Sequence, residues 1–388
     1  MTDSRLTHTD IAIVGGGPVG AALAIALTGS GHRVAVLEAR ETLQAPDPRA
    51  IALSEGSRLI LERLGVWATL APRATPITRI HVSQRGGFGR TELHADELGV
   101  PALGYVAEYG DLYAALGEQL MQSGTTVLTG ARVSQAAATA GYSMLGYSQA
   151  GEDHTLTADL VVLSEGGKAL PPAWRREHDY GQSAVVCTVR TALPHAGRAY
   201  ERFTPDGPIA LLPLGEDYAL VWTTASAAVE ARLAQSDAEF LRDLQAAFGD
   251  RQGTFVSAGP RAAFPLKLSL AKESASPRLL RIGNAAHVLH PVAGQGFNLG
   301  LRDAWKLAEA LIDQSAGSLG RTPLAAFHRQ RRADIDGGSL MTDLLVRGFA
   351  NDFPPLRRAR GLALAALDLL PPLRTQFARK MMFGAQSW

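Results

Sequence analysis

The stretch that decides the fold is DIAIVGGGPVGAALAIAL, at residues 10–27. An apolar, strand-like run at 11–14 passes through a glycine turn into an alanine-rich, helix-like run at 21–27, and a second strand-like run follows at 33–37. Together these runs predict a strand–helix–strand unit. The uncharged stretch from Ile11 to His32 is long enough for a membrane span, but the turn at Gly15–Pro18 breaks it and favours the buried unit.

Three glycines of this turn are spaced Gly15-x-Gly17-x-x-Gly20. In dinucleotide-binding turns the first glycine permits the tight turn, the second lets the backbone approach a pyrophosphate, and the third lets helix and strand pack closely. Glu38 ends the second strand, where a carboxylate accepts hydrogen bonds from a ribose diol. The spacing alone would also suit a structural turn. With the strand, the helix and Glu38 in register, it predicts a dinucleotide site.

Two textures alternate along the rest of the chain. Strand-like runs at 103–108, 126–128 and 160–163 and a helix over 111–122 are typical of a mostly parallel sheet. Residues 77–94 predict an antiparallel hairpin, and residues 184–224 predict a meander, followed by a helix with a capping box at Ser236 and Glu239. We expect an α/β protein in which a Rossmann-like cofactor domain carries an inserted antiparallel-sheet domain and a C-terminal helical tail.

The domain boundaries that we expect follow this alternation. The cofactor domain takes three segments, the inserted domain two, and the tail one. In chain order they are 6–76, 99–180 and 275–344 for the cofactor domain, 77–98 and 181–274 for the inserted domain, and 345–388 for the tail.

Composition excludes several classes of function. The chain has 388 residues, 46% of them hydrophobic, and its 38 basic and 37 acidic residues leave a net charge of +1, which argues against nucleic acid as a partner. The single cysteine, Cys187, excludes an intrachain disulfide and a cysteine-cluster metal site. The polar N-terminus lacks the apolar stretch of a secretory signal, so we expect a cytoplasmic location.

A second glycine-rich segment, GNAAHVLHPVAGQGFNLG at residues 283–300, lies far along the chain and leads into a long helix. It predicts a second contact to a long cofactor. His287 and His290 have the spacing of a metal pair, but no carboxylate or further histidine lies nearby in the sequence. A packing role beside the cofactor is therefore favoured, and no metal site is predicted.

Residues 283–303, GNAAHVLHPVAGQGFNLGLRD, resemble the hallmark of the flavin-dependent aromatic hydroxylases of the para-hydroxybenzoate hydroxylase superfamily, and most closely its ubiquinone-biosynthesis branch. Residues 49–53, 104–108 and 201–204 are similar to other segments of that family. The resemblance runs from about Asp10 to about Phe349. It implies FAD as cofactor, O2 as co-substrate, NAD(P)H as a transient reductant, and ring hydroxylation through a flavin C4a-hydroperoxide.

The resemblance also implies roles for individual residues. The flavin carries the chemistry, so no side chain is assigned as an acid or base. A helix starting near Asn298 would direct its positive dipole end at the flavin ring. The residues implied are Gly15, Gly17, Gly20 and Glu38 at the ADP half of FAD, Arg49 near the cofactor, Gly283 and Asn284 at the ribityl and phosphate region, and Pro291, Gly294, Gln295, Gly296 and Asn298 in and after the loop at the flavin ring.

One segment departs from the family pattern. Residues 165–168, EGGK, stand where the family usually has Asp-Gly followed by serine and arginine, so the pyrophosphate contacts there are in doubt. Elsewhere, four aromatic residues of the meander region either line a pocket for an aromatic ring or pack in the core, and both interpretations stay open: Tyr200, Phe203, Trp222 and Phe264.

The implied substrate is a polyprenylated phenol, 2-polyprenyl-6-methoxyphenol. Hydroxylation of a neighbouring ring position, a different FAD oxidoreductase acting on an apolar substrate, and a non-catalytic scaffold in a ubiquinone-biosynthesis assembly remain alternatives. The tail from Leu345 to Trp388 carries seven basic and two acidic residues beside leucine-rich runs. It either contacts the inner face of a membrane peripherally or packs on the domain as a solvated helix.

Overall fold

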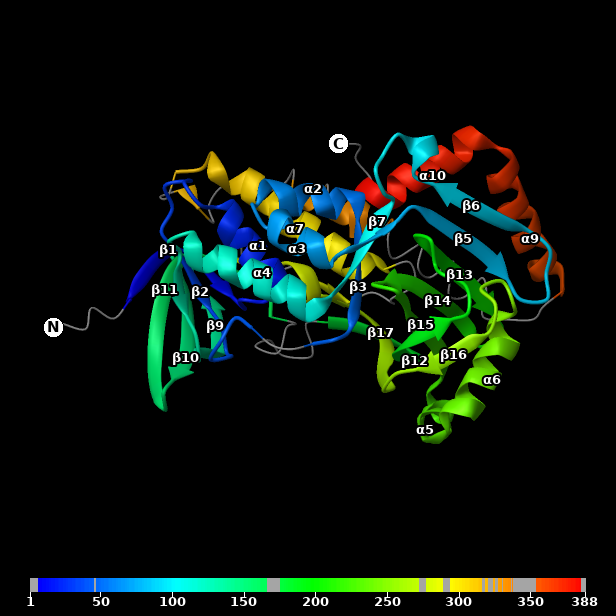
Figure 1. The fold of residues 1–388 in the computed structure, drawn as a ribbon. Helices are drawn as coiled ribbons and strands as arrows, with labels where there is room; N and C mark the ends of the chain where they lie inside the picture. The colour runs from blue at the N-terminus through cyan, green and yellow to red at the C-terminus, as the bar shows by residue number, and fades with distance from the viewer. Residues whose placement is uncertain are drawn as a thin grey trace.

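The computed structural model describes residues 6–44, 47–165, 175–271, 277–288, 294–315 and 354–384, together with 318–319, 324, 327–329, 331–335 and 337. Two large sheets lie at opposite ends of the molecule, with a small sheet between them (Figure 1). The expected α/β class with a mostly parallel sheet, an antiparallel sheet and a helical C-terminal region is confirmed.

The first large sheet contains seven strands. Five run parallel in the order β8-β2-β1-β11-β18, and an antiparallel hairpin, β9–β10, adds to the first half of the long strand β11. The strands are β1 (His8–Val14), β2 (Val34–Leu37), β8 (Thr126–Leu128), β9 (Arg132–Ala138), β10 (Ser143–Gln149), β11 (Glu152–Leu163) and β18 (Leu279–Arg281).

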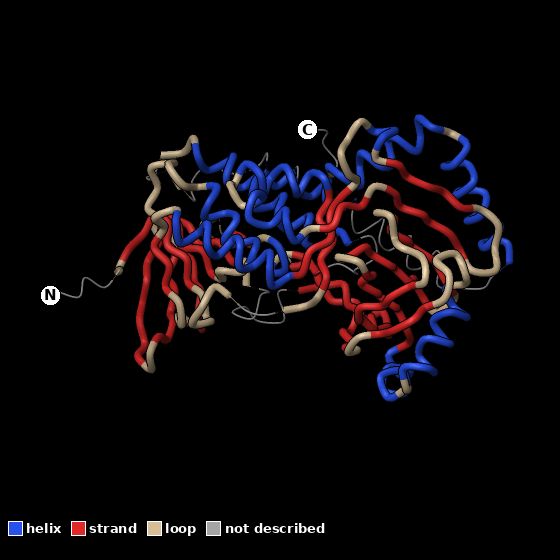
Figure 2. Tube along the Cα trace, in the orientation of Figure 1, coloured by secondary structure: helices blue, strands red, loops and turns tan. Residues whose placement is uncertain are grey.

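Both faces of the central parallel strands of this sheet are buried, which explains the continuous apolar run of β1. Ile11 and Ile13 of β1 face the helices, while Ala12 and Val14 face the side covered by β9 and β10. Figure 2 shows the helices gathered against the parallel strands. The helices packed in this region are α1 (Pro18–Ala26), α2 (Glu55–Arg63), α3 (Trp67–Leu70), α4 (Tyr109–Gln122) and α7 (Gln295–Ile312).

The small sheet has the order β3-β7-β4, with antiparallel pairs throughout. Its strands are β3 (Ala50–Ser54), β4 (Thr75–Ile77) and β7 (Gly104–Glu108). The sequence pattern placed the strand at 103–108 in the alternating parallel region, and that placement is wrong. β7 instead pairs with β3 and β4, the strands before and after α2, in the small sheet between the two large ones.

The second large sheet contains nine strands in the order β19-β17-β12-β15-β14-β13-β5-β6, with β16 beside β12. The expected hairpin is β5–β6, and it joins the expected meander through a parallel pair between β5 and β13. The strands are β5 (Arg79–Gln84), β6 (Arg90–His94), β12 (Arg175–Thr191), β13 (Arg198–Thr204), β14 (Gly207–Leu214), β15 (Asp217–Ala225), β16 (Phe255–Ala258), β17 (Ala262–Ala271) and β19 (His287–Val288).

Strand alternation gives this sheet two different faces. One face packs on α6 (Asp237–Phe248), whose Phe240 contacts Trp222, with α5 (Val229–Ala234) before it. The predicted capping box starts α6, because the Glu239 amide donates to the Ser236 hydroxyl and the Ser236 amide donates to the Glu239 carboxylate. The opposite face of the sheet is left for the site described below.

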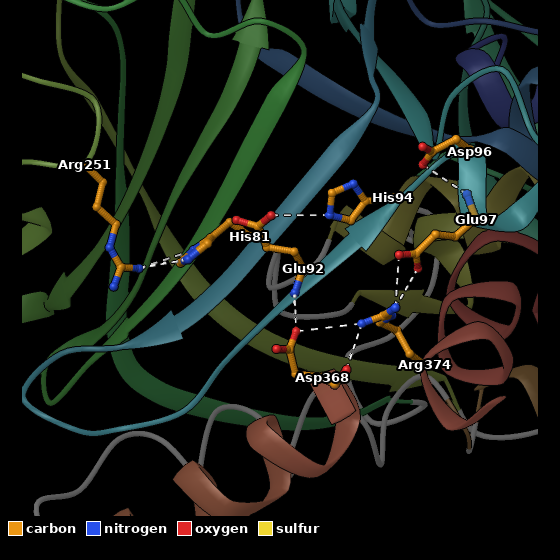
Figure 3. A network of polar contacts seen from close by, with 8 residues as sticks. All are labelled: His81, Glu92, His94, Asp96, Glu97, Arg251, Asp368 and Arg374. Atoms are coloured by element: carbon orange, nitrogen blue, oxygen red, sulfur yellow. Dashed lines mark hydrogen bonds and ion pairs between the residues drawn. The ribbon is translucent and has the colours of Figure 1, made fainter. Parts of the chain in front are cut away.

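Near the C-terminus, two helices pack beside β5 and β6 (Figure 1). They are α9 (Pro354–Leu369) and α10 (Pro371–Phe383). Arg374 donates to a carboxylate oxygen of Glu97 at 3.0 Å and to the Asp368 backbone carbonyl at 2.9 Å (Figure 3). The Glu92 amide donates to the Asp368 carboxylate at 3.3 Å. The tail is therefore docked by polar contacts on β6 and on the turn that follows it, and the basic Arg374 is paired there with Glu97.

We expect the α6 face to carry a large share of the stability of the antiparallel sheet. Phe240→Ala should lower the free energy of unfolding by about 3–5 kcal/mol, because the fully buried ring leaves a cavity. Phe88→Ala removes the same ring from a position 53% exposed, and should cost less than about 1 kcal/mol. Denaturant unfolding of both variants measures the difference. Equal costs would contradict this account of the core.

Candidate functional site

The first glycine turn has the geometry that its three glycines predict. Gly15 has φ +103°, and its amide donates to the Leu37 carbonyl at 2.8 Å. A Cβ on Gly20 would lie 2.0 Å from the Gly15 carbonyl oxygen, whereas a Cβ on Gly17 would meet no atom within 4 Å. The outer glycines are thus held by packing, and the middle one faces open space beside the N-terminus of α1, where a phosphate would bind.

Glu38 is buried at the end of β2 and turns its carboxylate back to the same turn. One oxygen accepts from the Gly16 amide at 2.7 Å and the other from the Arg40 amide at 2.9 Å. Each oxygen keeps a further lone pair, so the carboxylate is still able to accept from a ribose hydroxyl.

The two glycine-rich segments meet around one side chain. Val19, between Gly17 and Gly20, lies where a Cβ on Gly283 would come within 3.1 Å of its methyl groups, and a Cβ on Gly300 within 3.0 Å. Gly283 has φ +54°, a conformation that favours glycine. Segments far apart in the sequence are therefore packed backbone to side chain, which supports the prediction that both contact one long cofactor.

The segment that departs from the family pattern also reaches this turn. A Cβ on Gly15 would lie 2.8 Å from the Glu165 Cβ, and the preceding Ser164 hydroxyl lies 2.9 Å from the carbonyls of Val14 and Gly15. Residues 166–168 of that segment lie outside the described residues. Sequence reasoning missed Ser164, because a lone serine after a strand has no distinguishing pattern.

The start of α7 differs from the prediction by one turn of helix. It begins at Gln295, not near Asn298, so its unpaired amides belong to the Gly-Gln-Gly-Phe turn. The Asn298 side chain is buried, and all its hydrogen-bond donors and acceptors have partners. It accepts from the Ser54 amide and the Ser57 hydroxyl, at 2.8 and 2.6 Å, and donates to the Ala52 and Gly294 carbonyls, at 2.9 and 2.7 Å.

Asn298 therefore holds the α7 start onto β3 and the first turn of α2, and its side chain has no hydrogen-bonding capacity left for a cofactor. Gly294 has φ +60° at the turn itself, and Gly296 has open space where a Cβ would project. The Gln295 side chain donates to the Met381 carbonyl of α10 at 3.4 Å. Pro291 and His290 lie outside the described residues.

Asn284 and His287 have opposite surroundings. Asn284 is exposed on a 3₁₀ turn at Gly283–Ala285, where its amide is open to a ligand. His287 is buried, and its Nε2 lies 2.8 Å from the carboxylate of Asp303, which also accepts from the Gly283 amide at 3.1 Å. Burial opposes the charge on Asp303, but Arg331 and His287 hold its pKa below the ordinary value. This arrangement supports the packing role.

Arg49 lies between the two large sheets. Its guanidinium donates to the Asp47 carboxylate at 2.8 and 3.0 Å and lies over the rings of Tyr109 and Phe264, 5.5 and 5.2 Å from their centroids. The charge-assisted pair raises the pKa of Arg49. The contact that Arg49 makes in this structure is thus with a carboxylate, and its pyrophosphate contact stays a prediction.

A cavity of about 390 Å³ lies between the α7 start and the free face of the antiparallel sheet. Its walls are the backbone turn at 294–298, residues 50–54 of β3, alternate residues of β5, β13, β14 and β15, and one side of α10. α10 contributes Phe377, Ala378, Met381 and Met382. The lining is mostly apolar, and its polar side chains are Ser54, Tyr200, Glu201, Thr223, Gln295 and Asn298. The C-terminal tail therefore forms part of the site, which the sequence did not indicate.

The four aromatic candidates divide between cavity and core. Phe203 lines the cavity. Tyr200 contributes to the wall, but its ring packs on Phe248 and its hydroxyl donates to Gln252 at 2.8 Å. Trp222 packs in the α6 core, and Phe264 is partly exposed beneath Arg49.

One side chain in the cavity wall is charged. Glu201, on β13, faces the cavity, and burial away from bulk water raises its pKa to about 7. The family resemblance includes residues 201–204 only as a matching segment. A single glutamate within a strand belongs to no catalytic motif, so the sequence did not predict its position in the cavity.

Comparison with known proteins agrees with this geometry. A family model described as FAD binding domain matches residues 8–336. Ubiquinone hydroxylase UbiL of Rhodospirillum rubrum is 36% identical over 398 residues, covering 98% of this chain and 91% of that protein. The 3-demethoxyubiquinol 3-hydroxylase of Escherichia coli is 33% identical over 389 residues, covering 95% of this chain and 97% of that protein.

Among solved structures, p-nitrophenol 4-monooxygenase PnpA of Pseudomonas putida has the same fold, with a TM-score of 0.78 at 18% identity over 98% of this chain and all of that one. The chain therefore belongs to the FAD binding domain family, and within it to the flavin-dependent hydroxylases. FAD is its cofactor. Open space at Gly17 and Gly296, between turns that are otherwise tightly packed, fits an extended dinucleotide.

A pair of substitutions separates the structural and ligand roles of the turn. Gly20→Ala should reduce both stability and FAD content, because its Cβ collides with the Gly15 carbonyl oxygen. Gly17→Ala should fold normally and lose FAD affinity, because its Cβ enters the space reserved for the cofactor. Thermal unfolding of the FAD-free proteins and flavin absorbance after reconstitution give the two readouts. Full FAD affinity in Gly17→Ala would contradict the placement.

Proposed function

We propose that this member of the FAD binding domain family hydroxylates the aromatic ring of a polyprenylated phenol in ubiquinone biosynthesis. The observation that carries the proposal is the apolar cavity bounded by the α7 turn, which suits an aromatic ring with few polar groups. The identity to the Rhodospirillum rubrum and Escherichia coli hydroxylases over nearly the full chain supports the pathway.

Bound FAD, once reduced, supplies the reaction of O2 that delivers one oxygen atom to an electron-rich ring. The protein's own residues would bind the cofactor and the substrate and would keep water away from the reacting ring. Gly17 and Glu38 would hold the ADP half, and Gly283 and Asn284 the middle of the cofactor. The unpaired amides at the start of α7 would stabilise negative charge on the flavin ring. Phe203, Phe377 and their apolar neighbours would exclude water from the ring being hydroxylated.

Product analysis tests the proposal directly. Purified, FAD-loaded protein supplied with a chemical or enzymatic reductant, 2-polyprenyl-6-methoxyphenol and isotopically labelled O2 should give a phenol that carries one labelled oxygen atom. Unlabelled product, or O2 consumed only as hydrogen peroxide with every polyprenylated phenol offered, would contradict it. A deletion strain should accumulate the phenol that precedes the step.

Hydroxylation of a neighbouring ring position is the second candidate. It is favoured by the Escherichia coli relative, whose name assigns it to position 3 of a demethoxyubiquinol. Both compounds are offered separately, 2-polyprenyl-6-methoxyphenol first and the demethoxyubiquinol second. The substrate that yields labelled product, and the ring carbon that carries the label, decide between the two candidates.

The tail supports a contact with a membrane surface, where a polyprenylated substrate resides. Three exposed leucines, Leu369, Leu370 and Leu373, lie at the junction of α9 and α10, with Leu369 76% exposed, and the two helices also carry exposed basic side chains. The exposed set is Leu362, Leu369, Leu370 and Leu373, with Arg358, Arg379 and Lys380. No described helix has the length and apolar character to cross a bilayer. Peripheral binding to the inner, anionic face is proposed instead.

Vesicle sedimentation checks this contact. The double variant Leu369→Asp/Leu373→Asp should bind vesicles of mixed neutral and anionic lipid more weakly than the wild type, because two apolar contacts become charged. Met121→Asp, at an apolar position on α4 whose exposure of 63% lies between those of the two leucines, serves as the control and should bind normally. Added salt should weaken the wild type. Equal recovery of all three proteins would argue against a membrane role for the tail.

A further inference from the structure

Glu201 is placed by strand pairing in the middle of an apolar wall. On β13 its side chain shares the cavity face with Ala199 and Phe203. Its cross-strand partners are Ala210 on β14 and Val82 on β5, and both line the same cavity. The carboxyl group thus projects into the cavity from a sheet whose nearest neighbours on that face are apolar.

The ionisable side chains next to Glu201 on β13 and on the neighbouring strand β5 point to the opposite face of the sheet. Arg202 hydrogen-bonds to the Ser83 hydroxyl and the Ala247 carbonyl, both at 3.4 Å, and His81 pairs with Arg251 at 2.9 Å (Figure 3). β14 and the cavity residues of β15 carry no ionisable side chain.

The remaining walls of the cavity also place no charged side chain beside Glu201 among the described residues. The cavity residues of α10 are apolar, and its Arg379 and Lys380 are exposed to solvent. The only other ionisable residue in the described wall is Tyr200, whose hydroxyl is bound to Gln252. Among the described residues, Glu201 is therefore a single carboxyl group without a hydrogen-bond or ion-pair partner.

An unpaired carboxyl group in apolar surroundings lowers the stability of the fold unless a bound ligand forms a hydrogen bond with it. A carboxyl group held in apolar surroundings is disfavoured as the anion, and its pKa, about 7 against the ordinary 4.5, reflects that cost. A carboxyl group with a pKa near the working pH accepts and returns a proton readily. The Glu201 side chain and the α7 turn line one cavity, so a ring held there would lie within reach of both.

We propose that Glu201 is a catalytic residue that accepts the phenolic proton of the substrate. This inference rests on the proposed function. The phenolic O–H bond breaks, the proton moves to a carboxylate oxygen of Glu201, and the electron pair stays on the phenolic oxygen, with no change of oxidation state. The resulting phenolate is richer in electrons at the ring carbons that receive oxygen. When product leaves, the carboxylic acid returns its proton to water.

Three proteins test the assignment: the wild type, Glu201→Gln, and Glu230→Gln as a control that removes an exposed carboxylate from α5. In the wild type, kcat/KM for hydroxylation should rise with pH to a plateau above about 7, because the carboxylate is the active form. Glu201→Gln should lose this limb, with a rate at least about 10²-fold lower. Glu230→Gln should keep the wild-type profile.

Two further readouts separate a chemical role from a structural one. Glu201→Gln should keep its FAD and still consume O2, but release more of it as hydrogen peroxide per product formed. Its thermal midpoint should match that of the wild type below about pH 4.5, exceed it increasingly as pH rises to about 7, and exceed it by a constant amount at higher pH. As pH rises, the unfolded wild-type chain gives up the Glu201 proton before the folded one does.

The outcomes are distinguishable. A wild type that hydroxylates no polyprenylated phenol contradicts the proposed function, and this inference with it. A wild type that makes product, beside a Glu201→Gln variant with the same rate and the same pH limb, overturns the role of Glu201 alone. Loss of activity accompanied by loss of FAD in Glu201→Gln would assign the residue to structure, and also overturns the proposal.

Discussion

Close backbone contact around Val19 is the constraint on which the rest of the molecule depends. Gly283 and Gly300 of the second glycine-rich segment lie so close to Val19 that an added Cβ would come within 3.1 and 3.0 Å of its methyl groups, and a Cβ on Gly20 would lie 2.0 Å from the Gly15 carbonyl oxygen. An added side chain at Gly300 of α7 would collide with Val19 of α1, where these two helices pack on each other. Both helices start at turns with open space at Gly17 and Gly296, so this contact fixes the relative position of the two turns that would bind the cofactor. The fold thereby builds a dinucleotide site out of packing that already stabilises the core.

The parts of this arrangement that depend on local pattern could be predicted from the sequence. The glycine turn, Glu38, the capping box of α6 and the hairpin at β5–β6 each follow from spacing within a few residues. The partners of β7 and the first half of β11 could not be predicted, because strand pairing across the chain leaves no mark in a single sequence. The same holds for Asn298, whose four hydrogen bonds reach residues more than 240 positions away as well as its own turn.

The cavity also combines features that could be predicted from local sequence with features that could not. The sequence indicated which loop lies beside the flavin, but not which surfaces lie opposite it. Those surfaces come from alternate residues of four strands and from α10, and no motif joins them. Glu201 is an example, since only the parity of its position on β13 directs it into the cavity. A shift of one residue would exchange it with Arg202 and place a guanidinium in the apolar wall.

The placement of α10 has a consequence for the order in which the protein is assembled. Synthesis from the N-terminus completes both glycine turns by about residue 300, whereas Phe377 and Met382 emerge much later. A nascent or proteolytically trimmed chain would thus hold its cofactor groove before its substrate chamber is closed. Oxygen activation in such a chain would be poorly shielded from water. Docking of α10 is therefore the step that completes the apolar wall of the cavity.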